Sequence, residues 1–377
     1  MRHSSKILFL IAVLFISLLG AAQKAYVFVG TYNAAKEKDG IFVYQLDEKT
    51  GVLEPVTTYK GILNPAYLIV SANGKYLYAC TNAKVPGGGT VSSFEFNAAS
   101  KTLSFINSQS SGGDNPVYIT EHKSGKWIAN ANYTGGSLAI HPLLDNGKIG
   151  TETQVITFTD SSVNKERQEK SHVHQAIFSP RHDYIFFPDL GADKIRCYRF
   201  DESKEQPLQP AAIPFTRTIP GAGPRHMTFH PNEKYAYCIE EMLGMIDVYA
   251  YSNGKLDSIQ RISMHQESFA GPYSGADIHI SGDGKFLYAS NRGTENNLAI
   301  YAIQKNGKLK SVGYQSTFGE TPRNFSLSPN GKFLIVAHQT SGSIIVFERN
   351  AKTGLLKKTG TEIKVEGPSC VQIRQYE

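Results

Sequence analysis

Cysteine is scarce in this chain, with four residues in 377, and no two of them stand close together. Cysteine ligands of a structural metal usually come in pairs two to four residues apart, so the sequence lacks the common zinc-binding patterns. We expect the four to be small side chains of the core, and we predict no disulfide. They are Cys80, Cys197, Cys238 and Cys370.

The chain also lacks the short motifs of several large protein classes. It has no run of lysine and arginine, no phosphate-binding loop and no dinucleotide fingerprint. We therefore expect no nucleic-acid partner and no organic cofactor. It has no Gly-x-Ser-x-Gly sequence either, which disfavours a hydrolase with a serine nucleophile.

Long apolar runs are confined to the beginning of the chain. Arg2 and Lys6 precede an apolar run over residues 7–19, and small residues follow at 20–22. This order is typical of a signal peptide cleaved after Ala22, and the run is short for a membrane span; an uncleaved anchor is the alternative. We expect residues 1–22 to be a signal peptide and the mature protein to be periplasmic or secreted, not bound to the membrane. Its formal net charge falls from +6 to +4, a weak bias toward anionic ligands.

One pattern is written six times along the rest of the chain. Each copy is a strand, a tight turn of the Ser-Pro-Asn-Gly type and a second strand. The steps between the ends of the second strands are 51, 57, 51, 51 and 47 residues. A period near fifty built from short strands is the signature of β-propeller blades, because one four-stranded sheet cannot bury both faces alone. These second strands end at Thr81, Asn132, Asp189, Glu240, Asn291 and His338.

Two incomplete copies lie at the ends of the mature chain. Residues 25–33 match a second strand with no first strand before it, and residues 367–373 match a first strand with no turn after it. Together they make a seventh blade, with residues 371–373 paired beside residues 26–30. The expected fold is therefore all-β. Residues 23–377 form a single seven-bladed propeller of four-stranded blades, closed by pairing the C-terminal strand with the N-terminal blade.

The repeat allows residues to be compared column by column. In a propeller the first strand of each blade lines the channel and the second runs back, so the start of one and the end of the other meet at the same mouth. Most copies have small or neutral residues at these two positions. We expect the exceptions to converge on one small volume, and they are His174, Arg225, Arg323, Glu241 and Arg292.

Such a cluster indicates a small anionic ligand that undergoes proton transfer. Guanidinium groups bind carboxylates or phosphates through paired hydrogen bonds, and His and Glu are suitable acids and bases near neutral pH. The alternative is a solvated channel lining. We expect further substrate-binding residues on the neighbouring column and on a strand end, where two glycosylation-like triplets are taken as channel residues: His226, Asp277, Asn324 and Asn132.

Two pairs of residues have the spacing of metal ligands on a strand, namely His172 with His174 and Asp277 with His279. Neighbouring arginines would repel a cation, so we expect no metal, and we expect His279 to pack within its strand. The longest irregular stretch, residues 160–171, is predicted to be a loop at one mouth of the ring. It either covers a site or is simply solvated.

Several segments resemble the seven-bladed propeller lactonases, a family typified by the bacterial 6-phosphogluconolactonase that also includes fungal carboxy-muconate cyclases. The resemblance covers essentially the whole mature chain and is strongest over residues 29–33, 221–241, 276–292 and 321–334.

The family's proposed active site is one His, two Arg and one Glu at the channel mouth. By motif, the resemblance places these on His174, Arg225, Arg292 and Glu241. Many members have Asn before this Glu, whereas this chain has Glu240, so two carboxylates stand side by side. The column position favours Glu241.

The resemblance implies a hydrolase of a sugar-acid lactone such as 6-phosphogluconolactone, and we expect it to be metal-independent and monomeric. His174 would be the general base, the arginines would hold the anion and the oxyanion, and Glu241 would orient His174 or relay the proton. Two alternatives stay open. One is a muconate-type lactonizing cycloisomerase, and the other is a non-catalytic exported propeller that binds an anionic ligand or a protein partner.

Overall fold

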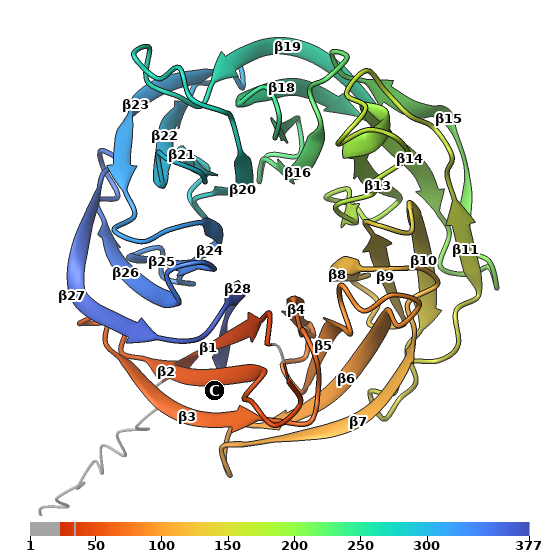
Figure 1. Cartoon of the computed structure of the whole chain (residues 1–377), viewed down its shortest axis with the longest axis vertical. Helices are drawn as coiled ribbons and strands as arrows, with labels where there is room; N and C mark the ends of the chain where they lie inside the picture. Colours follow the sequence, from red (N-terminus) through yellow and green to blue (C-terminus); the bar gives the residue numbers. More distant parts are fainter. Residues whose placement is uncertain (1–22, 34, 377) are drawn as a thin grey trace, which may run out of the picture.

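Seven four-stranded antiparallel sheets surround a central channel in the computed structural model of the protein (Figure 1). The structure describes residues 23–33 and 35–376. Within each sheet the first strand lies at the channel and the fourth at the outer edge, as the repeat predicts. The predicted all-β, seven-bladed fold is confirmed.

Six blades are built from consecutive strands. The first two of them are β4 (Tyr67–Val70), β5 (Tyr76–Thr81), β6 (Thr90–Asn97) and β7 (Thr102–Ser110), then β8 (Pro116–Glu121), β9 (Trp127–Asn132), β10 (Ser137–Pro142) and β11 (Gln154–Thr157). The next two are β12 (Ile177–Phe178), β13 (Tyr184–Asp189), β14 (Lys194–Phe200) and β15 (Leu208–Arg217), then β16 (Pro224–Phe229), β17 (Tyr235–Glu240), β18 (Met245–Ser252) and β19 (Lys255–Ser263). The last two are β20 (Gly275–Ile280), β21 (Phe286–Asn291), β22 (Asn297–Ile303) and β23 (Leu309–Ser316), then β24 (Pro322–Leu327), β25 (Phe333–His338), β26 (Ser343–Arg349) and β27 (Leu356–Lys364). A short 3-10 helix, η1 (Leu190–Ala192), follows β13.

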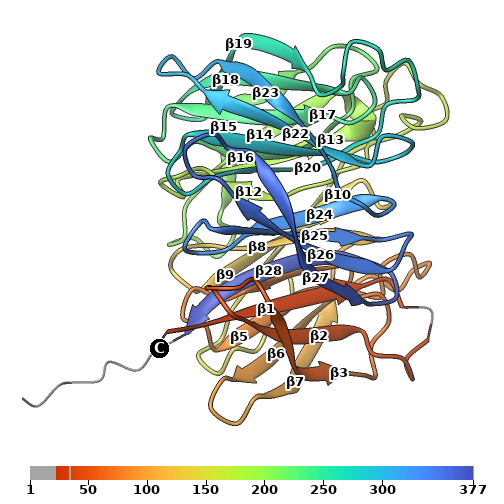
Figure 2. The same cartoon turned by 90° about the vertical axis from the view of Figure 1, so that its left-hand side faces the viewer.

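The seventh blade joins the two ends of the chain. It contains β1 (Lys24–Thr31), β2 (Ile41–Leu46), β3 (Leu53–Tyr59) and, at the channel, β28 (Pro368–Tyr376). Val29 lies opposite Val371 and Val27 opposite Ile373, which confirms the predicted closure. Figures 1 and 2 show β1 and β28 side by side from two directions.

The hydrophobic core lies between the blades. The alternation of apolar residues on each strand gives a sheet two apolar faces, and each cluster of buried side chains draws on two neighbouring sheets or more. Around the closing blade the rings of Tyr26 and Phe28 pack edge-on against Phe96, with centroids 5.1 and 5.0 Å apart. All four cysteines are buried, as expected, and none is in a disulfide.

A one-residue β-bulge recurs near the start of the inner strands. In β16, residues 225 and 226 together oppose a single residue of β17, since Pro224 pairs with Glu240 and Met227 with Cys238. β8, β20 and β24 shift register at the equivalent place. A bulge re-aims side chains that would otherwise alternate between faces. Two adjacent columns can therefore both turn toward the interior of the ring.

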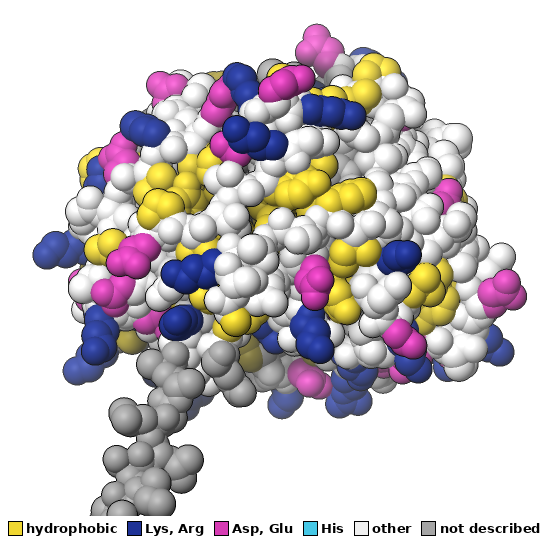
Figure 3. All heavy atoms as spheres, turned by 90° about the horizontal axis from the view of Figure 1, so that it is seen from below, with side chains coloured by type: hydrophobic (Ala, Val, Ile, Leu, Met, Phe, Trp, Pro, Cys, Tyr) yellow, Lys and Arg dark blue, Asp and Glu magenta, His cyan; other side chains and the backbone are white. Residues whose placement is uncertain are grey.

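The surface of the ring is of mixed charge. Figure 3 shows its lower edge, where basic and acidic side chains are intermixed and apolar side chains lie between them in small groups. Within residues 23–33 and 35–376, no helix is long and apolar enough to cross a membrane. The predicted signal peptide, residues 1–22, lies outside the described residues.

Candidate active site

A cavity of about 170 Å³ opens at one mouth of the channel. The two columns singled out in the sequence supply much of its wall, because the starts of the inner strands and the ends of the second strands meet there. The residues that line it are Tyr32, Lys84, Asn115, Val117, Tyr133, Arg167, His174, Glu241, Arg292 and Arg323.

Glu241, directly after β17, is held by three arginines. Its Oε2 lies 2.9 Å from Nε of Arg225 and 3.0 Å from Nη2 of Arg292, and its Oε1 accepts a hydrogen bond of 2.7 Å from Arg167. Burial alone would raise the pKa of Glu241, but the three guanidinium groups lower it to about 2. The carboxylate is therefore charged at any physiological pH and fixes the arginines around it.

Two of these arginines are also tied to the backbone at the start of β20, Arg225 from the preceding blade and Arg292 from the same blade. Arg225 donates to the carbonyl of Ala276, and Arg292 donates to the carbonyl of Gly275 at 2.8 Å. Burial, together with the nearby charges of Arg292 and Arg323, lowers the pKa of Arg225 to about 9. Arg225 stays protonated at neutral pH, so the cluster keeps a positive charge that Glu241 does not cancel.

His174 lies beside this cluster and is buried. Burial, and after it the charges of Arg225, His226 and Arg323, hold the pKa of its imidazole well below the usual 6.5. The ring is therefore neutral at neutral pH and can accept a proton. Its Nδ1 is buried without a hydrogen-bond partner, which leaves Nε2 as the nitrogen that can face the cavity.

The hypothesis that Glu241 orients His174 finds no contact to support it. Both oxygens of Glu241 are bound by arginines, and no hydrogen bond or ion pair joins it to His174 among the described residues. The two residues share the cavity wall, but the carboxylate acts on the guanidinium groups.

A second pair of cations, Lys84 and Arg323, faces the cavity from another side. Lys84 Nζ lies 4.1 Å and Arg323 Cζ 5.3 Å from the centre of the Tyr32 ring, and Arg323 donates a hydrogen bond of 3.3 Å to the Tyr32 hydroxyl. In the described part of the chain, no carboxylate lies within 4.0 Å of either cation. This side of the cavity can accept an anion.

Sequence reasoning missed Arg167, Tyr32 and Lys84. Tyr32 stands at the end of the second strand in the split blade, so extending the column to residue 32 would have found it. Lys84 follows the same column in the next blade by two residues. Arg167 belongs to the irregular segment 160–171, which has no counterpart in the other blades.

The predicted loop at residues 160–171 does lie over the site. Asp160 anchors one end through Lys194 at 2.6 Å and Arg196 at 2.5 Å, and Gln168 donates to Asp193 at 2.7 Å near the other end. Between these anchors the side chain of Arg167 reaches Glu241 while remaining 45% exposed. Of the two expectations for this loop, the structure favours the one in which it covers the site.

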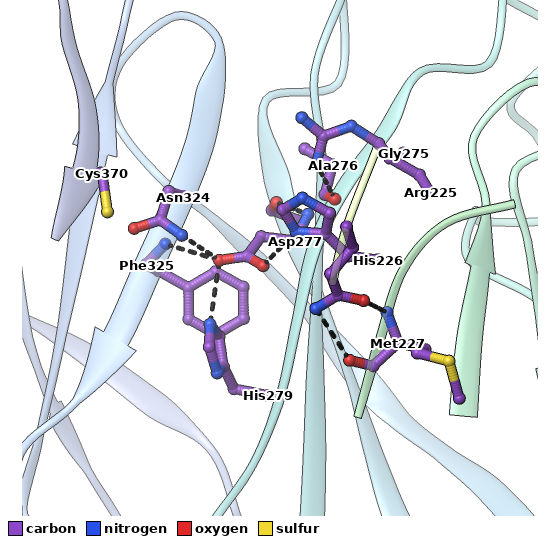
Figure 4. Close-up of polar contacts among 12 residues, drawn as sticks. Arg225, His226, Met227, Gly275, Ala276, Asp277, His279, Asn324, Phe325 and Cys370 are labelled. Carbon is purple, nitrogen blue, oxygen red and sulfur yellow. Dashed lines mark hydrogen bonds and ion pairs between the residues drawn. The ribbon is translucent and has the colours of Figure 1, made fainter. Parts of the chain in front are cut away.

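Three of the predicted binding residues lie deeper in the channel, on adjacent inner strands. His226 Nδ1 lies 2.8 Å from Oδ1 of Asp277, and Asn324 donates to Oδ2 of Asp277 at 2.5 Å (Figure 4). Their polar groups bind one another, so the structure does not bring Asp277 to the wall of the cavity. Asn132 is also not at the cavity: its amide donates to Ser111 O at 2.8 Å and Ser137 Oγ at 3.0 Å.

The two pairs with metal-ligand spacing are engaged in other contacts. His172 contacts the Tyr133 carbonyl at 3.0 Å and Glu169 at 3.1 Å through its two nitrogens. His279 contacts Oδ2 of Asp277 at 2.9 Å, and its ring packs edge-on against Phe325. No group of three metal-ligating side chains occurs within residues 23–33 and 35–376.

The chain is similar over most of its length to known proteins of one family. The model of the family described as "Lactonase, 7-bladed beta-propeller" matches residues 26–373. The chain belongs to this family. It is 39% identical to a 6-phosphogluconolactonase of Formosa agariphila, with 93% of this chain and 99% of that protein covered. It is 32% identical to a 6-phosphogluconolactonase of Bacillus subtilis, covering 92% and 97%. The solved structure of a periplasmic gluconolactonase from Pseudomonas aeruginosa superposes with a TM-score of 0.88 at 33% identity, covering 93% and 99%.

The two adjacent glutamates of this propeller lactonase differ sharply in their surroundings. Glu241 lines the cavity, whereas Glu240 ends β17 and is fully buried away from it. Burial, and after it the neighbouring Asp247, raise the pKa of Glu240 well above 4.5. Asp247 is itself paired with Arg261 at 2.5 Å. Burial therefore favours the neutral form of Glu240, whereas Glu241 is the ionised carboxylate of the site.

Glutamine substitutions separate the two positions. Glu241→Gln removes the charge that holds the arginines, so lactone hydrolysis should fall by at least tenfold. Glu240→Gln should leave turnover unchanged. The Tm of Glu240→Gln should exceed that of the parent by more at pH 8 than at pH 5. A carboxyl whose native pKa is raised costs the parent stability as the pH rises above the unfolded pKa, and glutamine removes this cost. Steady-state kinetics and thermal melts at both pH values measure these effects. Loss of turnover in Glu240→Gln alone would reassign the carboxylate.

Proposed function

We propose that this propeller lactonase hydrolyses a sugar-acid lactone of the 6-phosphoglucono-1,5-lactone type and releases 6-phosphogluconate. The observation that carries the proposal is a buried, neutral imidazole beside guanidinium groups in a cavity at the channel mouth. Relatives named 6-phosphogluconolactonase support the same substrate. We also propose that the protein acts as a monomer, since one chain supplies every residue named in this site.

In this proposal His174 is the general base. Its Nε2 takes a proton from a water molecule as the water oxygen attacks the lactone carbonyl. Arg225 and Arg292 stabilise the negative charge that develops on the carbonyl oxygen, and Glu241 keeps both guanidinium groups in place before the reaction begins. The bond from the carbonyl carbon to the ring oxygen then breaks, and the imidazolium of His174 returns the proton to that oxygen. The product is the open-chain acid.

The anionic end of the substrate lies against Lys84 and Arg323. A phosphate monoester carries a charge between −1.5 and −2 at neutral pH, which matches two cations that have no carboxylate partner among the described residues. Arg323 is already oriented by the Tyr32 hydroxyl. His226 and Asn324 lie below the lactone in this proposal, where both bond to Asp277.

We further propose that the protein is exported. Residues 1–22 have the order of basic, apolar and small residues found in signal peptides. A structural relative named as a periplasmic gluconolactonase supports the same compartment. We therefore place the mature propeller in the periplasm or outside the cell.

The signal peptide predicts a mature N-terminus close to residue 23. Intact-mass spectrometry of the protein purified from cell envelope or medium should show loss of about 22 residues. A cytoplasmic protein that retains Met1 would contradict export.

Replacing the general base should abolish turnover without unfolding the ring. His174→Ala should lower kcat for 6-phosphoglucono-1,5-lactone by roughly two to four orders of magnitude, the usual range for loss of a general base. Acid release followed in a pH-stat measures the rate, and circular dichroism controls for folding. Hydrolysis at the parental rate would leave the binding-scaffold alternative as the better account.

The phosphate end of the substrate can be tested separately. Lys84→Gln should raise KM for the phosphorylated lactone about tenfold or more, since a charge-assisted hydrogen bond contributes about 1.5–3 kcal/mol. It should hardly change the kinetics of unphosphorylated δ-gluconolactone. Lys308→Gln, which removes the same charge from an exposed turn in an outer hairpin, is the matched control. An equal effect of Lys84→Gln on both lactones would place the phosphate elsewhere.

A further inference from the structure

A second, much smaller cavity lies beneath the first. Its volume is about 10 Å³, and its walls include His174, His226, Tyr67 and Ser369. A space of roughly 10–15 Å³ holds one water molecule when two to four polar groups surround it. His174 lines both cavities and so stands between the substrate site and this pocket.

Two buried imidazole nitrogens beside this pocket have no hydrogen-bond partner. They are Nδ1 of His174 and Nε2 of His226. The two rings meet edge to face, with centroids 5.1 Å apart and planes at 70°. A buried polar nitrogen without a hydrogen-bond partner costs free energy of folding. We therefore expect each of these two nitrogens to have a partner in the native protein. No direct hydrogen bond joins the two rings, so a water molecule in the lower cavity can serve both nitrogens.

The tautomer of His226 is set from its other side. Its Nδ1 faces the carboxylate of Asp277 at 2.8 Å. Asp277 also accepts hydrogen bonds from His279 at 2.9 Å, from Asn324 at 2.5 Å and from the Phe325 amide at 3.2 Å (Figure 4). A carboxylate that accepts four hydrogen bonds is held in its ionised form. His226 therefore carries its proton on Nδ1 and offers Nε2 as an acceptor.

We propose that one water molecule in the lower cavity joins His174 to His226, so that Asp277 and His226 position the general base from below. His174 donates from Nδ1–H to this water, the water donates to Nε2 of His226, and Nδ1–H of His226 donates to Asp277. Each of the three hydrogen bonds in this relay joins one donor to one acceptor. His226 and Asp277 are then positioning residues that fix the tautomer of His174 with Nε2 free toward the lactone.

This inference rests on the proposed function, in which Nε2 of His174 takes the proton. The imidazolium formed in that step stands among like charges. The relay connects this imidazolium to the ionised carboxylate of Asp277, which stabilises its positive charge. Glu241 is already bound by three arginines. The titratable and charged groups that face the two histidines are Arg225, Arg323, Glu241, Tyr133, Tyr67, Tyr118 and Asp277.

A pair of matched variants tests the relay. His226→Leu removes the acceptor, while His279→Leu removes a different hydrogen bond to the same Asp277 and does not touch the lower cavity. His226→Leu should lower kcat about tenfold or more with KM unchanged, and His226→Gln, which keeps an acceptor and a donor, should recover most of it. The acid limb of kcat/KM should move to lower pH, because the His174 imidazolium loses its path to Asp277. His279→Leu should change neither quantity. Equal losses in the two leucine variants would overturn the relay and leave Asp277 a purely structural role.

A second measurement does not depend on turnover. In protein labelled with nitrogen-15 at histidine, NMR should show His174 protonated on Nδ1 in its neutral form. It should also show a lower titration midpoint of His174 in His226→Leu than in the parent or in His279→Leu. An unchanged tautomer and midpoint in folded His226→Leu would overturn the relay. If the shift appears but the parent hydrolyses no lactone, the relay stands and the proposed function fails.

Discussion

The pairing of β1 with β28 is the constraint on which the rest of the molecule depends. It joins strands from opposite ends of the chain and turns seven sheets into a closed ring. Only in a closed ring do the inner strands surround one channel. Tyr32, directly after β1, meets Arg323 across nearly three hundred residues of sequence because of this closure. The candidate site is thus a product of the whole ring and of no single blade.

Charged side chains on the cavity wall fall into two groups with different surroundings. Glu241 binds arginines from its own blade, from the next blade and from the loop at 160–171. Its negative charge offsets the repulsion between these guanidinium groups and holds them in place. Lys84 and Arg323, on the other side, have no carboxylate partner in the part of the chain that the structure describes. One side of the cavity is therefore built before any ligand arrives, and the other is left open to an anion.

The sequence predicted the blades, the closing strand and most of the charged cluster, because a repeat allows equivalent positions of the blades to be compared within one sequence. It did not reveal Arg167, since a loop without counterparts offers no column to compare. It also misplaced Asn132 and Asp277. Neighbouring columns look alike in sequence, whereas only three-dimensional contacts tell a side chain in the cavity wall from one that bonds to its neighbours beneath it or between blades. The resemblance to propeller lactonases named the four central residues but not the network below them.

The bulge in the inner strands has a consequence for how such a protein can change. It brings two successive residues of a strand to the interior of the ring. The apolar residues that follow on the strand pack between neighbouring blades. Substitutions in the first of these two columns alter the chemistry of the channel. Substitutions in the second also change contacts between blades, because Asp277 bonds to His226 and Asn324 on the two adjacent blades. The ligand preference of the channel can therefore change at one residue of each inner strand while the apolar packing between the sheets is retained.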